Sequence, residues 1–143
     1  MRYKFKETVL QGNFDIAKKI FQKLSNKEAT DILIEIALSE NILGYAFVCE
    51  LIRQKDCVEY HLMAVAINEC ACFVNGSYEL AFYHMKRICQ ATPVIKYLEH
   101  LLFYNDIPDK LLSDSDAFKL ASYILKEDSS NQIALAKVQE LAK

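Results

Sequence analysis

The residues of this chain whose types and spacing could support chemistry are five cysteines and three histidines among 143 residues. Cys57 and His61 are four residues apart, so on a helix they could offer two zinc ligands on one face. A zinc site needs two further ligands, and we interpret this pair instead as packing residues on a buried helix. Cys70 and Cys72 would point about 200° apart on a helix, which prevents a shared metal or an ordinary disulfide.

The other two histidines have no motif around them that would make either a catalytic base. We expect His84 and His100 in a groove or on the surface. The sequence has no glycine-rich phosphate loop, no nucleophile elbow and no histidine pair flanking a glutamate. Because catalysis needs a nucleophile and an oriented base, we predict no enzyme, no catalytic residue, no cofactor and no metal.

Composition is typical of a soluble globular protein of one domain, residues 1–143. Hydrophobic residues make up 52% and charged residues 25%, and the formal net charge is −2. The longest apolar run, 62–67, is far too short to cross a membrane, and we see no apolar signal core near Met1. An odd number of cysteines without framework spacing favours reduced core thiols. We therefore expect a cytoplasmic location.

Helical periodicity runs through almost the whole chain and predicts an all-α fold of about nine helices without strands. Between residues 14 and 24, apolar residues recur at intervals of three and four. Ser25 and Glu28 have the spacing of a capping box. Thr92 and Pro93 resemble a cap followed by a first-turn proline, and Ser129 or Ser130 would cap the last helix. The later expected helices span 26–40, 42–54, 57–74, 77–90, 93–104 and 113–126, with a last one ending near 142.

A repeat is indicated by the three glycines, which stand at 12, 44 and 76, two intervals of 32 residues. The stretches GNFDIAKKIFQKL and GSYELAFYHMKRI share a glycine, an aromatic residue two positions on, an alanine at five and an aliphatic residue at twelve. This pattern resembles the tetratricopeptide repeat, a helix–turn–helix unit with such a turn glycine and small residue. Gly44, within LGYAF, suits a helix better than a turn. The resemblance implies a short right-handed solenoid of antiparallel helix pairs, with armadillo-like stacking as the alternative.

Charge is unevenly distributed along the chain. Residues 1–27 carry seven basic and two acidic residues, a net of +5, whereas residues 28–85 carry two basic and nine acidic residues, a net of −7. Glu28, Asp31 and Glu35 share one helical face, and Glu59 and Glu69 extend the acidity. Like charges on one face destabilise it, so the arrangement indicates a cationic partner; the alternative is a solvated face without a role.

In helical solenoids of this type the first helix of each pair lines the concave groove. An acidic groove containing tyrosines suits a basic protein surface, whereas nucleic acid would need a basic stripe. The predicted partner-binding residues are therefore Glu28, Asp31, Glu35, Glu59, Tyr60, Glu69, Lys96, His100 and Tyr104.

Three function classes follow. The profile resembles the helical-repeat immunity proteins of bacterial contact-dependent or polymorphic toxin systems, which implies a protein that binds and occludes a cationic, nuclease-like toxin domain. The alternative is a tetratricopeptide-type adaptor or secretion chaperone that binds a peptide or helix in its groove. A third class is a helical metal or redox module using Cys57, His61 and other cysteines. The sequence also leaves homodimerisation as an alternative, because so short a solenoid lacks obvious polar caps at both ends and could stack on a second copy.

Overall fold

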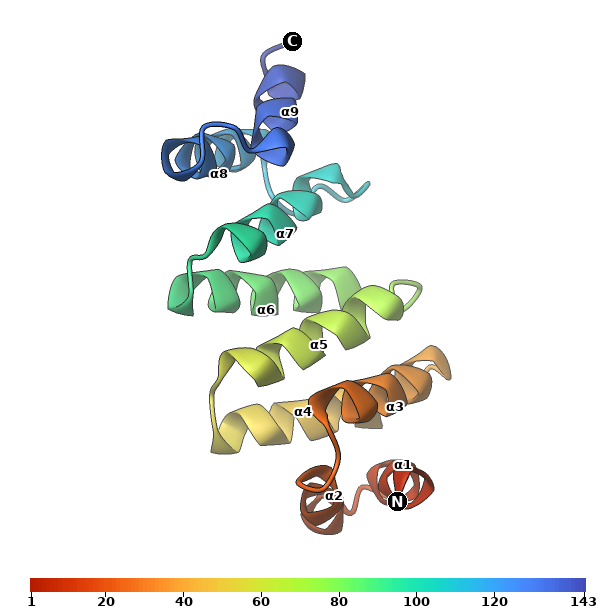
Figure 1. The fold of residues 1–143 in the computed structure, drawn as a ribbon. Helices are drawn as coiled ribbons and strands as arrows, with labels where there is room; N and C mark the ends of the chain where they lie inside the picture. The colour runs from red at the N-terminus through yellow and green to blue at the C-terminus, as the bar shows by residue number, and fades with distance from the viewer. The chain divides into compact units, whose positions relative to one another are not determined.

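The computed structural model describes all 143 residues, which form nine α-helices and no strand (Figure 1). This confirms the predicted all-α class and the number of helices. The chain divides into two compact units, residues 1–84 (unit 1) and residues 85–143 (unit 2), and the division falls inside the sixth helix. The helices are α1 (Arg2–Leu10), α2 (Phe14–Phe21), α3 (Asn26–Leu38), α4 (Leu43–Gln54), α5 (Val58–Cys70), α6 (Ser77–Ala91), α7 (Ile95–Asp106), α8 (Asp114–Glu127) and α9 (Gln132–Leu141).

The core of unit 1 contains an aromatic cluster around Phe47 of α4. The Phe47 ring lies 5.5 Å from the rings of both Phe5 and Phe14, edge to face, and 6.0 Å from that of Phe21. Such offset aromatic pairs add to the stabilisation that burial of the rings already gives. Because the four rings come from α1, α2 and α4, this cluster joins the first two helices to the rest of unit 1.

The helices α3, α4 and α5 pack against one another to form the remainder of this core. The five apolar residues expected to face inward from α3 are all buried: Ala29, Ile32, Leu33, Ile36 and Ala37. Figure 1 shows α3 and α5 running side by side in the same direction, with α4 running in the opposite direction. Gly44 lies inside α4, where a Cβ atom would stand 3.1 Å from the Leu33 carbonyl oxygen. The absent side chain therefore lets α3 and α4 approach closely.

Two turns of unit 1 depend on glycine, as the repeat pattern predicted. Gly12 and Gly76 have φ angles of +71° and +87°. Gly12 lies two residues before the start of α2, and Gly76 lies directly before α6. Residues with a Cβ atom rarely adopt such angles, so these glycines permit the chain to reverse.

Three predicted helix boundaries were wrong. Pro93 does not begin α7, which starts at Ile95 after the extended cap residue Val94. A proline disfavours helical angles at the residue before it, and α6 accordingly ends at Ala91. The cap of α9 is Asn131, whose side chain accepts a hydrogen bond from Ala134 N–H at 2.9 Å, while Ser130 bonds to Asp128 instead. The helix expected over 57–74 ends at Cys70, because its last four residues form a turn.

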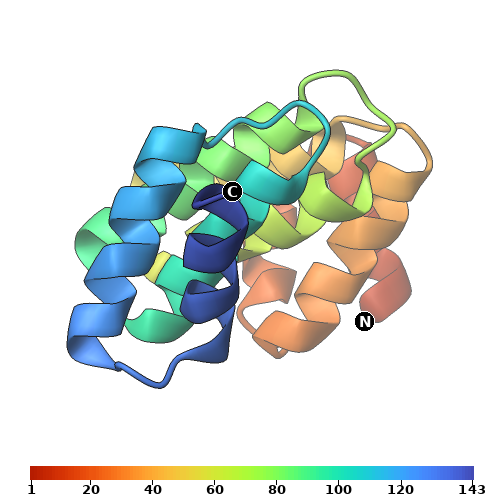
Figure 2. The same ribbon diagram turned by 90° about the horizontal axis from the view of Figure 1, so that it is seen from above.

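Unit 2 contains α7, α8 and α9, and α8 packs against both other helices. The side-by-side packing of α8 and α9 is visible from two directions (Figures 1 and 2). Two small residues of α8, Ala117 and Ala121, are fully buried. Ser113 caps α8 as predicted, since its hydroxyl accepts a hydrogen bond from Asp116 N–H at 3.1 Å.

The carboxyl end of α3 closes in a Schellman motif that has glutamate where glycine is usual. Asn41 N–H donates to the Ile36 carbonyl at 3.4 Å, and Glu40 N–H donates to the Ala37 carbonyl at 2.9 Å. Glu40 consequently has a φ angle of +59°. A side chain with a Cβ atom is strained there, and a carboxylate is unfavourable beside the negative end of a helix dipole.

We expect Glu40→Gly to stabilise unit 1 by about 1 kcal/mol, because it removes both the strained conformation and the misplaced charge. Chemical denaturation at pH 7 measures the change. The matched control is Gly12→Ala, which puts a Cβ atom at a positive φ angle and should lower stability by about 1 kcal/mol. A destabilised Glu40→Gly variant would show that the Glu40 side chain makes a compensating contact.

Candidate functional site

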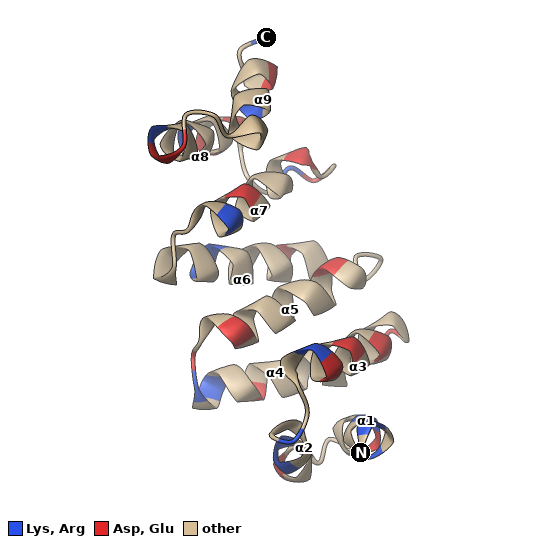
Figure 3. Ribbon diagram, in the orientation of Figure 1, with Lys and Arg blue, Asp and Glu red and all other residues tan.

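The acidic residues predicted to bind a partner lie on α3 and on α5, and basic residues lie on α1 (Figure 3). The structure pairs the three α3 carboxylates with cations of the same unit. Arg2 lies 3.8 Å from Glu28, and Lys6 lies 3.3 Å from Glu35, so α1 contributes two of the cations. Asp31 is 3.0 Å from Lys27, one turn away on the same helix. The excess positive charge of the first 27 residues thus partly offsets the acidity of α3.

Two of the predicted carboxylates also have a local structural role at helix starts. Glu28 completes the predicted capping box: its carboxylate accepts from Ser25 N–H at 2.9 Å, and the Ser25 hydroxyl accepts from Glu28 N–H at 3.1 Å. The Ser25 N–H, and next the Ser25 hydroxyl, donate hydrogen bonds to the Glu28 carboxylate and hold the pKa of Glu28 below its ordinary value. Glu59, in the first turn of α5, also has a lowered pKa, chiefly because it accepts a hydrogen bond from its own backbone N–H.

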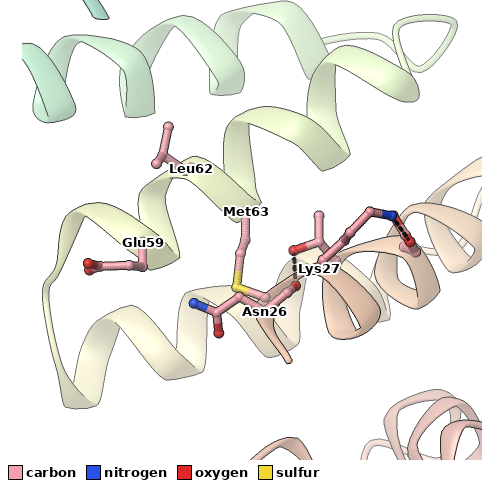
Figure 4. A pocket seen from close by; sticks show the side chains of 7 residues that line it. Asn26, Lys27, Glu59, Leu62 and Met63 are labelled. Atoms are coloured by element: carbon pink, nitrogen blue, oxygen red, sulfur yellow. Dashed lines mark hydrogen bonds and ion pairs between the residues drawn. The ribbon is translucent and has the colours of Figure 1, made fainter. Parts of the chain in front are cut away.

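A hollow of about 300 Å³ lies at the amino ends of α3 and α5. We call it the amino-end hollow; it is lined by Asn26, Lys27, Thr30, Asp31, Glu59, Leu62 and Met63. Figure 4 shows Met63 extending from α5 toward Asn26, with Glu59 and Lys27 on opposite sides of the hollow. The structure therefore brings two predicted residues, Asp31 and Glu59, to one concave feature that Leu62 and Met63 also line.

The remaining predicted residues of unit 1 are placed differently. The Tyr60 ring is partly buried and lies 5.9 Å from the Phe21 ring, edge to face, so it packs on the core. Glu69 lies near the carboxyl end of α5, remote in sequence from the amino-end hollow. Neither residue lines that hollow.

The three predicted residues of unit 2 lie along α7. Lys96 is exposed, and its ammonium group lies 4.9 Å from the centre of the Tyr97 ring. His100 is partly buried and stacks on Tyr104 with an interplanar angle of 11°. The prediction that Tyr104 lines a groove was wrong, because its side chain is 0% exposed.

A chain of four hydrogen-bonded side chains crosses the interior of unit 1, and sequence reasoning did not find it. Tyr45 Oη lies 2.7 Å from His84 Nε2, His84 Nδ1 lies 2.8 Å from His61 Nδ1, and His61 Nε2 lies 2.6 Å from an Asp56 carboxylate oxygen. Both histidines are buried, with His84 only 3% exposed. The expectation that His84 lies in a groove or on the surface was therefore wrong.

Chemistry fixes the direction of these hydrogen bonds when both histidines are neutral. The Asp56 carboxylate can only accept, so His61 donates from Nε2 and accepts at Nδ1. His84 then donates from Nδ1 and accepts at Nε2, and the Tyr45 hydroxyl donates to it. All four imidazole nitrogens are occupied, so neither histidine has a nitrogen free to take a proton from a substrate. Burial raises the pKa of Tyr45, which keeps its hydroxyl protonated in this role.

One feature of the sequence could have located His84. It shares a helical stripe of α6 with three apolar residues that are all buried, Ala81, Met85 and Ile88. A polar residue on such a stripe needs an internal partner. Nothing in the sequence, however, indicates that the partner is His61, on another helix 23 positions earlier.

The cysteines do not assemble into a site. All five are free thiols, and no three His, Cys, Asp or Glu side chains lie in an arrangement that could hold a metal ion. Cys57 precedes α5 as its cap residue, while His61 is engaged with Asp56 and His84. Burial raises the pKa of Cys89 to about 11, so this thiol stays protonated at neutral pH. Cys70 and Cys72 are exposed, against the expectation of core thiols.

Unit 2 has its own buried polar centre around Lys137. The Lys137 side chain is 4% exposed, and its ammonium group donates to Asn105 at 2.9 Å, to Glu140 at 3.0 Å and to Asp106. Burial opposes the charge, but the hydrogen bonds to the carboxylates outweigh it and raise the pKa of Lys137. The cluster links α7 to α9 and is structural.

Neither a known protein family, nor a curated protein, nor a solved structure matches the sequence. No helix of the chain is both long enough and apolar enough to cross a membrane.

The buried His84 should make stability depend on pH. Burial, and next the neighbouring His61, lower the pKa of His84 to about 4, below its ordinary 6.5. The unfolded chain therefore binds this proton first, so the free energy of unfolding should fall as pH drops from about 6.5 toward 4. We expect a loss of roughly 2 kcal/mol between pH 7 and pH 5 in urea titrations.

The variant His84→Gln isolates this contribution, because glutamine retains polar groups without titrating. It should flatten the pH profile in that window. An unaltered profile in His84→Gln would contradict the assignment.

Removal of the Lys137 ammonium group should destabilise unit 2. Lys137→Met keeps the length of the side chain but leaves Asn105 and Asp106 without their donor, and we expect a loss of about 2 to 3 kcal/mol. Thermal unfolding measures it. The exposed Lys119 supplies the control, since Lys119→Met should change stability by less than about 0.5 kcal/mol. Equal effects of the two variants would show that the cluster contributes nothing.

Proposed function

We propose that this protein is a non-catalytic binding module whose α3–α5 face binds a basic protein partner. The observation that carries this proposal is the amino-end hollow, which the apolar Leu62 and Met63 line together with the acidic Asp31 and Glu59. Glu59 stands on one side, and the Lys27–Asp31 pair stands on the other (Figure 4).

A lysine or arginine side chain matches this arrangement. Its methylene stem can cover apolar surface while its charged head reaches a carboxylate. The existing pair between Lys27 and Asp31 does not prevent this, because the Lys27 side chain is 86% exposed and such surface pairs contribute only about 0.3 to 0.5 kcal/mol. A partner cation can replace Lys27 when pairing with Asp31 costs it less desolvation and less side-chain entropy than it costs Lys27.

The docking of α1 supplies an internal precedent. Arg2 and Lys6, one turn apart on α1, contact Glu28 and Glu35 of α3. The acidic face of α3 therefore already accepts a basic helix from the same chain. A partner that presents a similar pair of cations would meet the carboxylates that remain accessible along α3 and α5.

The partner class that we propose is a cationic toxin domain with nuclease-like chemistry, in which case this protein acts as an immunity protein. Enzymes that act on phosphate esters need cations around the substrate, and a bound acidic surface would occlude them. The parallel α3 and α5 with the antiparallel α4 are also what a tetratricopeptide-like repeat would produce, which supports a partner-binding role for this face. The fully occupied histidine pair supports a role without catalysis.

The test is a charge reversal at the hollow. The protein would be used to capture partners from its native lysate, and the captured basic protein would then be purified and titrated by calorimetry. We expect Asp31→Lys combined with Glu59→Lys to weaken binding at least tenfold, because two attractions become repulsions, and high salt should weaken the wild-type complex.

The matched control reverses the same number of charges on exposed residues of unit 2, as Asp109→Lys combined with Glu127→Lys. It should bind like the wild type. Equal binding by both double variants would contradict the acidic-face mechanism. Capture of several unrelated peptides or secreted substrates, indifferent to these charges, would favour the adaptor or secretion-chaperone function instead.

A further inference from the structure

A second hollow, of about 200 Å³, lies at the opposite, carboxyl ends of α3 and α5. We call it the carboxyl-end hollow. Apolar side chains line most of it, among them Ile42 at the start of α4, Ile67 of α5 and Leu80 of α6. Glu40, the residue with the strained backbone, also lines it.

Large apolar side chains around this hollow are left in water. Ile42 is 77% exposed, and Val74 and Leu80 are 37% and 38% exposed. A contiguous exposed apolar patch on a small protein is a mark of an interaction surface, whereas single exposed residues are not. The three residues come from separate segments of unit 1, so the fold itself gathers them around one concavity.

The turn that carries Ile42 is held in place by its own hydrogen bonds. The Asn41 side chain accepts a hydrogen bond from Leu43 N–H at 2.9 Å, and Asn41 N–H bonds back to the carboxyl end of α3. Ile42 is therefore presented outward by an ordered turn rather than by a loose loop. A preformed surface of this type loses little conformational freedom on binding.

Glu40 indicates the charge of the occupant. Its carboxylate lies just beyond the carboxyl end of α3, where the last peptide carbonyls already make the potential negative. Glycine would relieve the backbone strain, and a cation would suit the dipole, so glutamate is disfavoured here on both local grounds. Residues that violate local preference without an internal benefit are concentrated at functional sites. A positive group on a partner would complement both the carboxylate and the helix end.

We propose that the carboxyl-end hollow binds a segment of another protein that inserts one large apolar side chain flanked by lysine or arginine. A volume of about 200 Å³ accommodates one apolar anchor, with Ile42, Val74 and Leu80 around it. Flanking cations would then meet Glu40 at the rim.

This inference is independent of the proposed partner at the amino-end hollow, because different residues line the two hollows. The variants below leave Asp31 and Glu59 intact. Failure of one site would therefore not remove the other.

The probes are three synthetic 15-residue helical peptides in an alanine–glutamine background. The first has a central phenylalanine with lysines three and four residues to either side. The second replaces the phenylalanine by serine, and the third replaces the lysines by glutamates. Titration of the full-length ¹⁵N-labelled protein, followed by amide chemical shifts, locates and measures binding.

We expect the first peptide to bind with a dissociation constant below about 1 mM. The chemical-shift changes should be centred on residues 40–42 and 74–80. Ile42→Ser should weaken it about tenfold or more, because it removes an apolar contact. Glu40→Gln, which keeps the size of the side chain, should weaken it about three- to fivefold at low salt, and Glu7→Gln on α1 should leave it unchanged. The serine and glutamate peptides should bind much more weakly.

Several results would overturn the proposal. One is the absence of chemical-shift changes at 1 mM of the first peptide, or changes centred on other residues. The others are equal binding of the lysine and glutamate peptides, and equal binding of the first peptide by the wild type and Ile42→Ser. Sedimentation equilibrium covers the other occupant: a dimer of the wild type that Ile42→Ser converts to monomer would assign the hollow to a second copy of this chain. The thermal transition of each variant checks that it is folded. Glu40→Gly removes the charge but should be more stable than the wild type, so a loss of binding in this variant would not be due to unfolding.

Discussion

The direct packing of α3 against α5 is the interaction on which the candidate surfaces of unit 1 depend. The antiparallel α4 packs against both of them. Because α3 and α5 run in the same direction, their amino ends meet at one hollow and their carboxyl ends meet at another. Gly44 contributes to this geometry, since a Cβ atom at that position would press on the Leu33 carbonyl oxygen. Were the two helices antiparallel, each hollow would combine one amino end with one carboxyl end.

The direction of the helices also sorts the charges. Acidic residues at the amino ends are stabilised by the helix dipole and by capping, as Glu28 shows with Ser25. A carboxylate at the carboxyl end has neither benefit, as Glu40 shows. Two acidic residues at opposite ends of α3 thus have opposite effects: Glu28 contributes to the stability of the helix, and Glu40 opposes it. Net charge along the sequence does not distinguish them.

Polar groups inside the protein follow a consistent rule in both units. The Tyr45–His84–His61–Asp56 chain of unit 1 and the Lys137 cluster of unit 2 each connect helices that are distant in sequence, and every buried side-chain polar atom has a partner. An unsatisfied polar group in a low-dielectric interior would cost about 1 to 3 kcal/mol, so such networks favour one arrangement of the helices. The two ends of the unit 1 chain reach different places. Asp56 is exposed at the surface, whereas Tyr45 lines the carboxyl-end hollow.

The sequence by itself determined the all-α class, nine helices, the inward face of α3, the capping box at Ser25 and the turn glycines at 12 and 76. These features depend on residues within a few positions of one another, where helical periodicity, capping and φ preference act. The sequence also located the acidic residues, but not the Arg2 and Lys6 that pair with them from α1. Only the tertiary structure decided that Tyr104 and His84 are buried, that His61 meets His84, and that Glu40 and Ile42 border a hollow with Leu80. Those relations join residues 23 to 40 positions apart, and they depend on which helices pack together, which local preferences do not encode.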